Sequence, residues 1–163
     1  MNKETLCALL AVILAGAGGV SAAQSSFETL LTVSDVQKVT GLKGIRLLPR
    51  DTSKGRHWDL NFHQQDGAMV VAVGITQGER APAVWKGKLE ELAIIKNQGG
   101  KVIKVAGVGD EAFEAELAGR SFHFRKGKSA VTVESGEKGN FSGVPLLSSE
   151  QIRGLAKIIA SRL

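Results

Sequence analysis

Residues 101–134 decide the fold class and read KVIKVAGVGDEAFEAELAGRSFHFRKGKSAVTVE. Four strands are predicted within this stretch, at 101–105, 112–117, 120–125 and 129–134. Apolar and polar residues alternate in them, and short turns that contain glycine separate them. Strands that follow one another without a helix after each indicate an antiparallel sheet.

An earlier hairpin is predicted over 57–75. Trp58, Leu60 and Phe62 share one face of its first strand, Asp66-Gly67 is a strong hairpin turn, and the second strand is apolar.

The two hairpins resemble each other. Leu60-Asn61-Phe62 with Val71 and Val73 after the turn has the same pattern as Phe122-His123-Phe124 with Val131 and Val133. The turns differ in length, so we do not expect the two registers to superimpose. The residues leave open whether this is an old duplication or two ordinary hairpins.

A helix is predicted before the first hairpin and another at the end of the chain. The first ends at Gly41 and begins at Thr32 or Ser34, since either side chain can cap it. The last begins at Ser148, with Gln151 in the position that completes a capping box. Both predictions depend on local hydrogen-bonding groups more than on composition.

A middle helix is predicted from Pro82 to Gly99-Gly100. One face of it is expected to pack on the sheet, through Trp85, Leu89, Leu92 and Ile95. The order of elements predicts an α+β fold, with a mostly antiparallel sheet and helices packed on one or both faces, as in an α/β/α sandwich.

The first 23 residues have the pattern of a secretory signal peptide. Lys3 precedes an apolar run over 6–15, and small residues offer a cleavage site near Ala22–Gln24. Cys7, the single cysteine, lies inside this segment. We therefore expect a periplasmic or secreted protein whose mature chain has no cysteine. An uncleaved membrane anchor is the alternative, because a spanning helix needs about 20 apolar residues.

The rest of the chain is expected to form one domain. A flexible leader is predicted for 24–30 and a single α+β domain for 31–163. A domain of this size buries enough surface to fold without disulfides.

The net charge of +5 is concentrated in residues 38–56, which contain six basic side chains and one acidic one. Arg46, Arg50, Lys54 and Arg56 are the candidate binding residues for an anionic polymer or a membrane surface. A solvated loop is the alternative interpretation. Nucleic acid is not the expected partner, because the stretch has no aromatic side chain that stacks on bases.

No catalytic motif is recognised. The Gly-x-Ser-x-Gly elbow of hydrolases is absent, and 107–110 lacks the spacing of phosphate-binding loops and predicts a turn. His63 and His123 would form a weak zinc site with Asp59 or Asp66 if their strands were neighbours. Solvent-facing strand histidines are the alternative. No cofactor or metal is predicted.

Two motifs carry a resemblance. Val105–Phe113 contains Gly-Val-Gly-Asp followed by an alanine and an aromatic residue, and Phe122–Gly127 contains aromatic-x-Arg-Lys-Gly. In these motifs and in the closing helix the chain resembles a loose class of bacterial exported or lipid-anchored proteins, mostly of unknown function, several of them similar to the PsbP-like α/β/α fold. The resemblance implies a fold and no activity, because its motifs are turn and core positions. The chain lacks the lipidated cysteine of the anchored members.

Three functional hypotheses follow. The first is an exported, non-enzymatic domain that binds a protein or small ligand in the cell envelope. The second is a polyanion-binding or surface-binding protein that uses the basic stretch. The third is a metal-dependent hydrolase.

Overall fold

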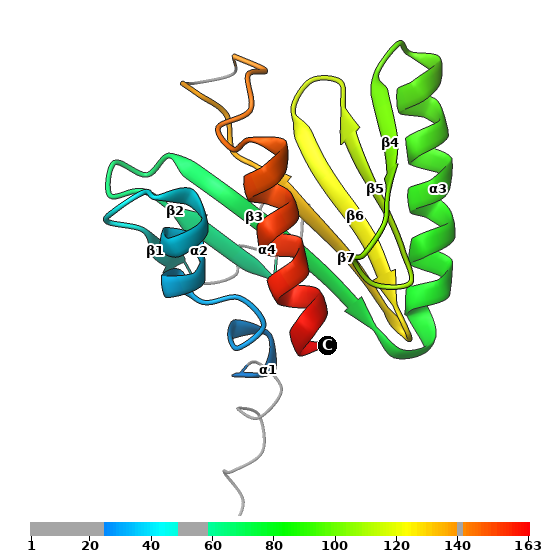
Figure 1. Cartoon of the computed structure of the whole chain (residues 1–163), viewed down its shortest axis with the longest axis horizontal. Coiled ribbons are helices and arrows are strands. Elements are labelled where there is room, and N and C mark those ends of the chain that lie inside the picture. The colour runs from blue at the N-terminus through cyan, green and yellow to red at the C-terminus, as the bar shows by residue number, and fades with distance from the viewer. Residues whose placement is uncertain (1–24, 49–58, 140–141) are drawn as a thin grey trace, which may run out of the picture.

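The computed structural model describes residues 25–48, 59–139 and 142–163. A seven-stranded sheet forms its centre, in the order β1-β2-β3-β7-β6-β5-β4, and every neighbouring pair of strands is antiparallel (Figure 1). The strands are β1 (Arg46–Leu48), β2 (Leu60–His63), β3 (Met69–Gln77), β4 (Lys101–Val105), β5 (Glu111–Glu116), β6 (Arg120–Lys126) and β7 (Ser129–Ser135). The predicted α+β fold with an antiparallel sheet is confirmed.

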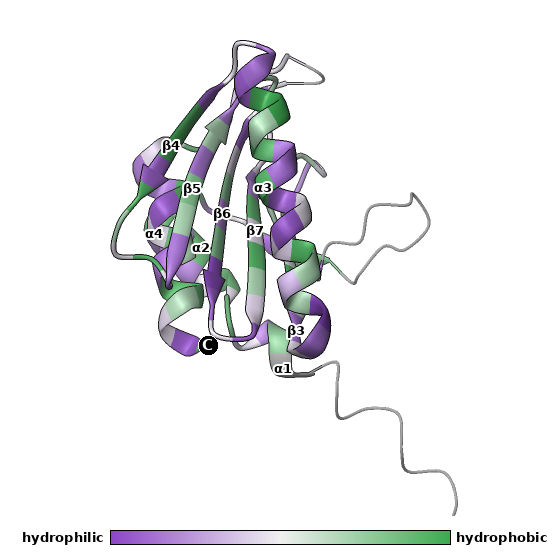
Figure 2. Ribbon diagram, turned by 90° about the vertical axis from the view of Figure 1, so that its right-hand side faces the viewer, coloured by the Kyte–Doolittle hydropathy of each residue, from purple (hydrophilic) through white to green (hydrophobic). Residues whose placement is uncertain are grey.

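Helices lie on both faces of the sheet (Figure 2). They are α1 (Ser25–Glu28), α2 (Val33–Thr40), α3 (Ala81–Asn97) and α4 (Ser149–Arg162), with a short 3-10 turn, η1 (Gly78–Arg80), before α3. α2 and α4 pack together on one face, and α3 crosses the other. In the described part of the chain, no helix has the length and apolar character needed to span a bilayer.

The two faces differ in their side chains because successive strand residues point to opposite sides. Phe122 and Phe124 are fully buried beneath α4, whereas Ser121 and His123 point to the α3 face, as the alternation predicted. The main core, on the α4 face, also contains the valines of β3 and β7 and the apolar stripe of α4: Val71, Val73, Val131, Val133, Ile152, Leu155 and Ile159.

The Gly-Val-Gly-Asp segment is a turn, as predicted. Gly109 has φ +60°, and a Cβ there would lie 2.4 Å from the Arg125 carbonyl oxygen. Val108 is buried, and the Asp110 carboxylate accepts a hydrogen bond from the Gly127 N–H at 2.8 Å. The motif therefore fastens the β4–β5 connection to the β6–β7 turn, which explains its glycine and aspartate without any phosphate.

Local capping groups define the ends of α2 and α4. Thr32 caps α2 in a capping box with Asp35, so the Thr32 start is correct and the Ser34 start is not. Ser148 caps α4 with Gln151, as predicted. Gly41 ends α2 with φ +74°, a left-handed conformation that glycine adopts without steric cost.

The two hairpins have equivalent registers, contrary to the expectation from their unequal turns. Leu60 and Phe62 pair with Val73 and Val71, and the aromatic residues of β6 pair with Val133 and Val131 in the same way. A register shift between Phe62 and His63 absorbs the difference in length. Val73 also faces Val133 across the centre of the sheet, so a local two-fold axis relates the hairpins.

Other details differ from the sequence-based expectations. β1 was not predicted, because a three-residue strand within a basic stretch is too short to show an alternation of apolar and polar residues. In the first strand of the earlier hairpin, predicted from residue 57, His57 and Trp58 lie outside the described residues, and β2 begins at Leu60. Residues 25–30, assigned to a flexible leader, include the α1 turn, and Leu30 is 7% exposed. In α3, Leu89 is 38% exposed and does not belong to the buried face.

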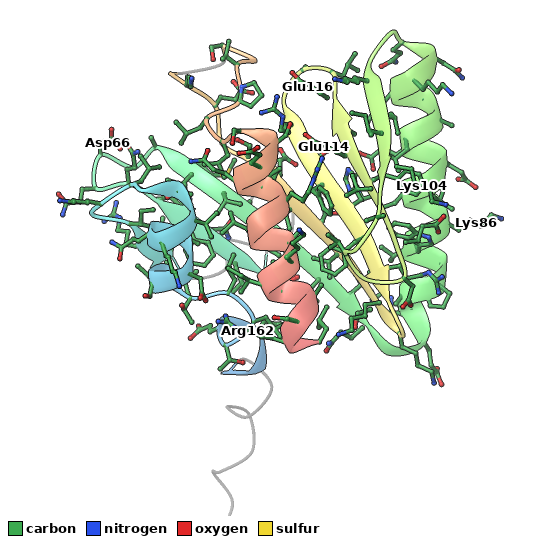
Figure 3. All side chains as sticks on the ribbon, in the orientation of Figure 1. Asp66, Lys86, Lys104, Glu114, Glu116 and Arg162 are labelled. Atoms are coloured by element: carbon green, nitrogen blue, oxygen red, sulfur yellow. The ribbon has the colours of Figure 1, made fainter. Side chains whose placement is uncertain are left out.

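The end of α4 is tied to the start of α2 by Asp35 and Arg162 (Figure 3). The Arg162 guanidinium donates to both Asp35 carboxylate oxygens, at 2.6 and 3.0 Å. Hydrogen bonds from this guanidinium hold the pKa of the Asp35 carboxyl well below its usual range. The ion pair therefore contributes to stability only while Asp35 is ionised.

Replacing Asp35 with asparagine is expected to reduce the free energy of unfolding by about 2 kcal/mol at pH 7. Because the folded-state pKa is depressed, the contribution is present above the unfolded value of about 3.9 and is lost as pH falls through the folded-state pKa. Urea denaturation of both proteins at several pH values measures this. If the difference in free energy of unfolding between the parent and the variant stayed constant down to about pH 2, the assignment would be contradicted.

Candidate functional site

The helix α3 covers only part of its sheet face. It contacts β3, β4, β5 and β7. An open groove of about 910 Å³ runs along α3 above β3 and β7; we call it the α3 groove.

Small side chains make the floor of the α3 groove. Gly74 faces Thr132 and Thr76 faces Ala130 across the β3–β7 pair, and all four line the groove. The alternate positions of the same strands carry larger valines that fill the α4 face. Because side chains alternate along each strand, the large residues fill the α4 face, and the small residues leave a hollow on the α3 face.

One flank of α3 forms the wall of the groove. Val84, Lys88 and Glu91 recur at three- and four-residue spacing along that flank, so they lie on one side of the helix. Lys88 and Glu91 are joined by an ion pair of 2.5 Å. Trp85 lies at the base of the wall, where it is 6% exposed.

Trp85 is held in place by the sheet. Its indole N–H donates to Glu111 at 3.1 Å, and its ring lies 6.2 Å from the Phe113 ring centroid. This confirms the prediction that Trp85 attaches α3 to the sheet. It also means that the groove has a rigid aromatic edge.

The described lining of the groove contains charged groups of both signs. Its described lining includes four carboxylates and two cations: Asp59, Glu91, Glu134, Glu137, Arg80 and Lys88. Asp59 accepts a hydrogen bond from the Ile75 N–H at 2.7 Å, and Glu137 accepts one from the Gly143 N–H at 3.0 Å. Asp59 and Glu134 each have an interaction partner within the chain, so neither carboxylate is a free charge for a ligand.

A buried chain of hydrogen bonds lies beside the floor of the α3 groove, on the same face of the sheet and under α3. His123 is 1% exposed, its Nε2 is 2.8 Å from the Ser121 hydroxyl, and its Nδ1 is 3.1 Å from the Thr132 hydroxyl. Burial is the main cause that lowers the pKa of His123 to about 4; the positive charge of Lys88 acts in the same direction and Glu91 opposes it. The imidazole is therefore neutral at pH 7, with one ring nitrogen donating and the other accepting.

Replacing His123 with glutamine is expected to remove part of the pH dependence of stability. The folded-state pKa is below the unfolded value of about 6.5, so the unfolded chain binds the extra proton, and stability falls as pH drops from 6.5 to 4. The slope contributed by one such group is at most about 1.4 kcal/mol per pH unit. Urea denaturation between pH 7.5 and 4.5 measures it, and equal slopes for the variant and the parent would contradict the assignment.

The hypothetical zinc site is wrong. His63 is on β2 and His123 on β6, and β3 and β7 lie between them. At a strand spacing of about 4.8 Å, this places the two strands roughly 14 Å apart. His63 instead lies 2.9 Å from the Gly67 carbonyl oxygen, and Asp66 accepts from the Ala68 N–H. Within the described residues, no group of three or more metal-binding side chains is assembled.

The alternative for these histidines was exposure to solvent, and for His123 this too is wrong. The alternation correctly predicted that it points away from the phenylalanines, but α3 covers it. Only the position of that helix decides its burial.

The basic candidate site is described at one position only. Arg46 is exposed on β1, at the edge of the sheet. Arg50, Lys54 and Arg56 lie outside the described residues.

Sequence reasoning missed the α3 groove. Its signal was the run of small residues at alternate positions in β3 and β7, which is visible only when the register of the two strands is known. Comparisons with protein-family models, curated proteins and solved structures find no match for this chain. The interpretation of the groove therefore depends on its own geometry and chemistry.

Proposed function

We propose that this protein is an exported, non-enzymatic binding domain of the cell envelope, and that the α3 groove holds its ligand. The observation that carries the proposal is the groove itself. Its volume of about 910 Å³ falls within the range of roughly 300–1,000 Å³ that is typical of ligand sites. It combines an aromatic edge with polar and charged walls, which is also typical of such sites.

The hydrogen-bonded side chains next to the groove favour binding over catalysis. His123 is the side chain best suited to act as a general base, but it is buried and both ring nitrogens already face hydroxyl groups. A general base must come within hydrogen-bonding reach of the substrate proton, and Thr132 separates this imidazole from the groove. These hydrogen bonds therefore stabilise the sheet and do not act on a ligand.

The polar lining of the groove limits the class of ligand. Because the described lining contains both carboxylates and cations, we propose a protein segment or small molecule that carries polar or charged groups. A complementary charge raises the rate of association and the specificity of binding.

Site-specific photo-crosslinking in intact cells tests the proposal. A photoreactive residue in place of Val84, which is 36% exposed and lines the groove, is expected to form a discrete adduct whose mass identifies the ligand as protein or small molecule. Lys157, exposed on α4 at the opposite face, is the matched control position. Adducts at both positions alike, or at neither, would contradict the proposed site.

A blocking variant sharpens the test. Thr76→Trp adds bulk to the floor of the groove and is expected to reduce the Val84 adduct at least ten-fold, while circular dichroism confirms that the sheet remains folded. An unchanged adduct would place the ligand elsewhere. N-terminal sequencing of the protein from the envelope fraction tests export separately, with a new terminus expected near Ala22–Gln24.

A further inference from the structure

We propose that two copies of this chain associate through β4, so that their sheets join edge to edge around a two-fold axis. β4 is the last strand of the sheet, and among the described elements it pairs only with β5 (Figure 2). The outer edge of such a strand presents unpaired backbone N–H and C=O groups that can pair with another strand. This inference does not depend on the proposed function.

The sequence of β4 is complementary to itself in one antiparallel register. If Ile103 lies opposite its own symmetry mate, Lys101 faces Val105 and Lys104 faces Val102 of the second copy. No lysine then lies directly opposite another, which avoids the repulsion of like charges across a strand pair. Ile103, which is 39% exposed in the single chain, gains an apolar neighbour.

Lys104 is already held away from the edge. Its ammonium group lies 3.4 Å from Glu111 and 5.8 Å from the Phe113 ring centroid. Both partners are on β5, so the side chain bends back over its own sheet. The charge that usually protects an edge strand is therefore partly neutralised within the chain.

The second flank of α3 extends the same surface. Leu89 is 38% exposed and lies one helical turn from Ala93, on the side of α3 away from Val84, Lys88 and Glu91. Since those three residues face the groove, this flank faces the β4 edge. Only three residues of the 17-residue helix are buried, although apolar side chains occur around its whole circumference. A second α3 beside the first would cover this flank.

The arrangement leaves both grooves open, because each groove lies on the flank of α3 that faces β3 and β7. An interface formed by the strand alone is small compared with the roughly 800 Å² per partner of a stable complex. The contact between the α3 flanks is therefore part of the proposal.

Engineered disulfide formation tests the register. In purified protein that carries Cys7→Ser, so that no other cysteine is present, Ile103→Cys is expected to crosslink into a dimer on mild oxidation. Opposite residues on antiparallel strands have Cα atoms about 4.5–5.5 Å apart, within disulfide reach. Val144→Cys, at an apolar position that is 49% exposed, is the control and is expected to remain monomeric.

Light scattering of the parent protein provides the second measurement. We expect a two-fold increase in molecular mass as concentration rises, and loss of this increase in Ile103→Lys, which places two ammonium groups opposite each other. Val144→Lys is expected to associate like the parent. A mass of one chain at all concentrations, or a dimer in which Ile103→Cys crosslinks no faster than Val144→Cys, would overturn the proposal.

Discussion

Replacing Gly136 with alanine is expected to lower the free energy of unfolding by about 4 kcal/mol, among the largest effects of single substitutions. A Cβ at this position would lie 1.8 Å from the Met69 carbonyl oxygen and 2.6 Å from its carbon. Both are backbone atoms of β3 and cannot rotate aside. Gly136 also donates to the Val70 carbonyl at 2.9 Å and accepts from the Leu146 N–H at 2.7 Å, so any shift would strain these backbone hydrogen bonds.

Urea denaturation measures this effect, and Gly87→Ala is the matched control. Gly87 lies within α3, and a Cβ there would meet no atom within 4 Å. Alanine in a helix is more favourable than glycine by about 0.8–1.0 kcal/mol, so we expect stabilisation. Similar small effects of the two substitutions would show that the strands do not approach each other at Gly136 as closely as described.

Replacing Glu114 with alanine is expected to lower the free energy of unfolding by about 3–5 kcal/mol. This side chain on β5 is 5% exposed and lies between two guanidinium groups, at 3.0 Å from Arg153 of α4 and 3.5 Å from Arg120 of β6 (Figure 3). Without the carboxylate, two cations face each other at a partly buried site. Arg120 keeps its ion pair with Glu116, so most of the penalty comes from the Arg153 guanidinium, which loses its carboxylate partner.

The neighbouring Glu116 provides the control. It also binds Arg120, at 2.8 Å, but its side chain is 41% exposed, so removing it is expected to cost less than about 1 kcal/mol. Guanidinium chloride would screen these charges, so urea is the better denaturant for the comparison. Equal losses for Glu114→Ala and Glu116→Ala would show that burial does not separate the two carboxylates.

Local features of this protein could be predicted from the sequence, because the interactions that produce them are also local. The start of α4 follows from Ser148 and Gln151, and the turn before β5 follows from Gly109 and Asp110, groups that act within a few residues or on a neighbouring strand. The start of α2 was ambiguous because two adjacent residues can cap. The structure favours Thr32, whose partner Asp35 also binds Arg162 from the far end of the chain.

Burial of particular side chains was less predictable. His123 and Leu89 each have the local pattern that was assigned to them, yet the histidine is buried and the leucine is exposed. Both outcomes depend on where α3 crosses the sheet. That position is set by Trp85 with Glu111 and Phe113, contacts between segments that are separated by the whole β4 strand.

The amino-acid sequence by itself determined most of the elements, the cap of α4, the turns, the alternation of the longer strands and the antiparallel class of the sheet, because hydrogen bonds and side-chain periodicity act over short distances along the chain. Tertiary structure alone decided the strand order that separates His63 from His123, the face that each helix covers, and the α3 groove. These features arise where residues distant in sequence meet, and their free energies depend on packing that no single segment contains.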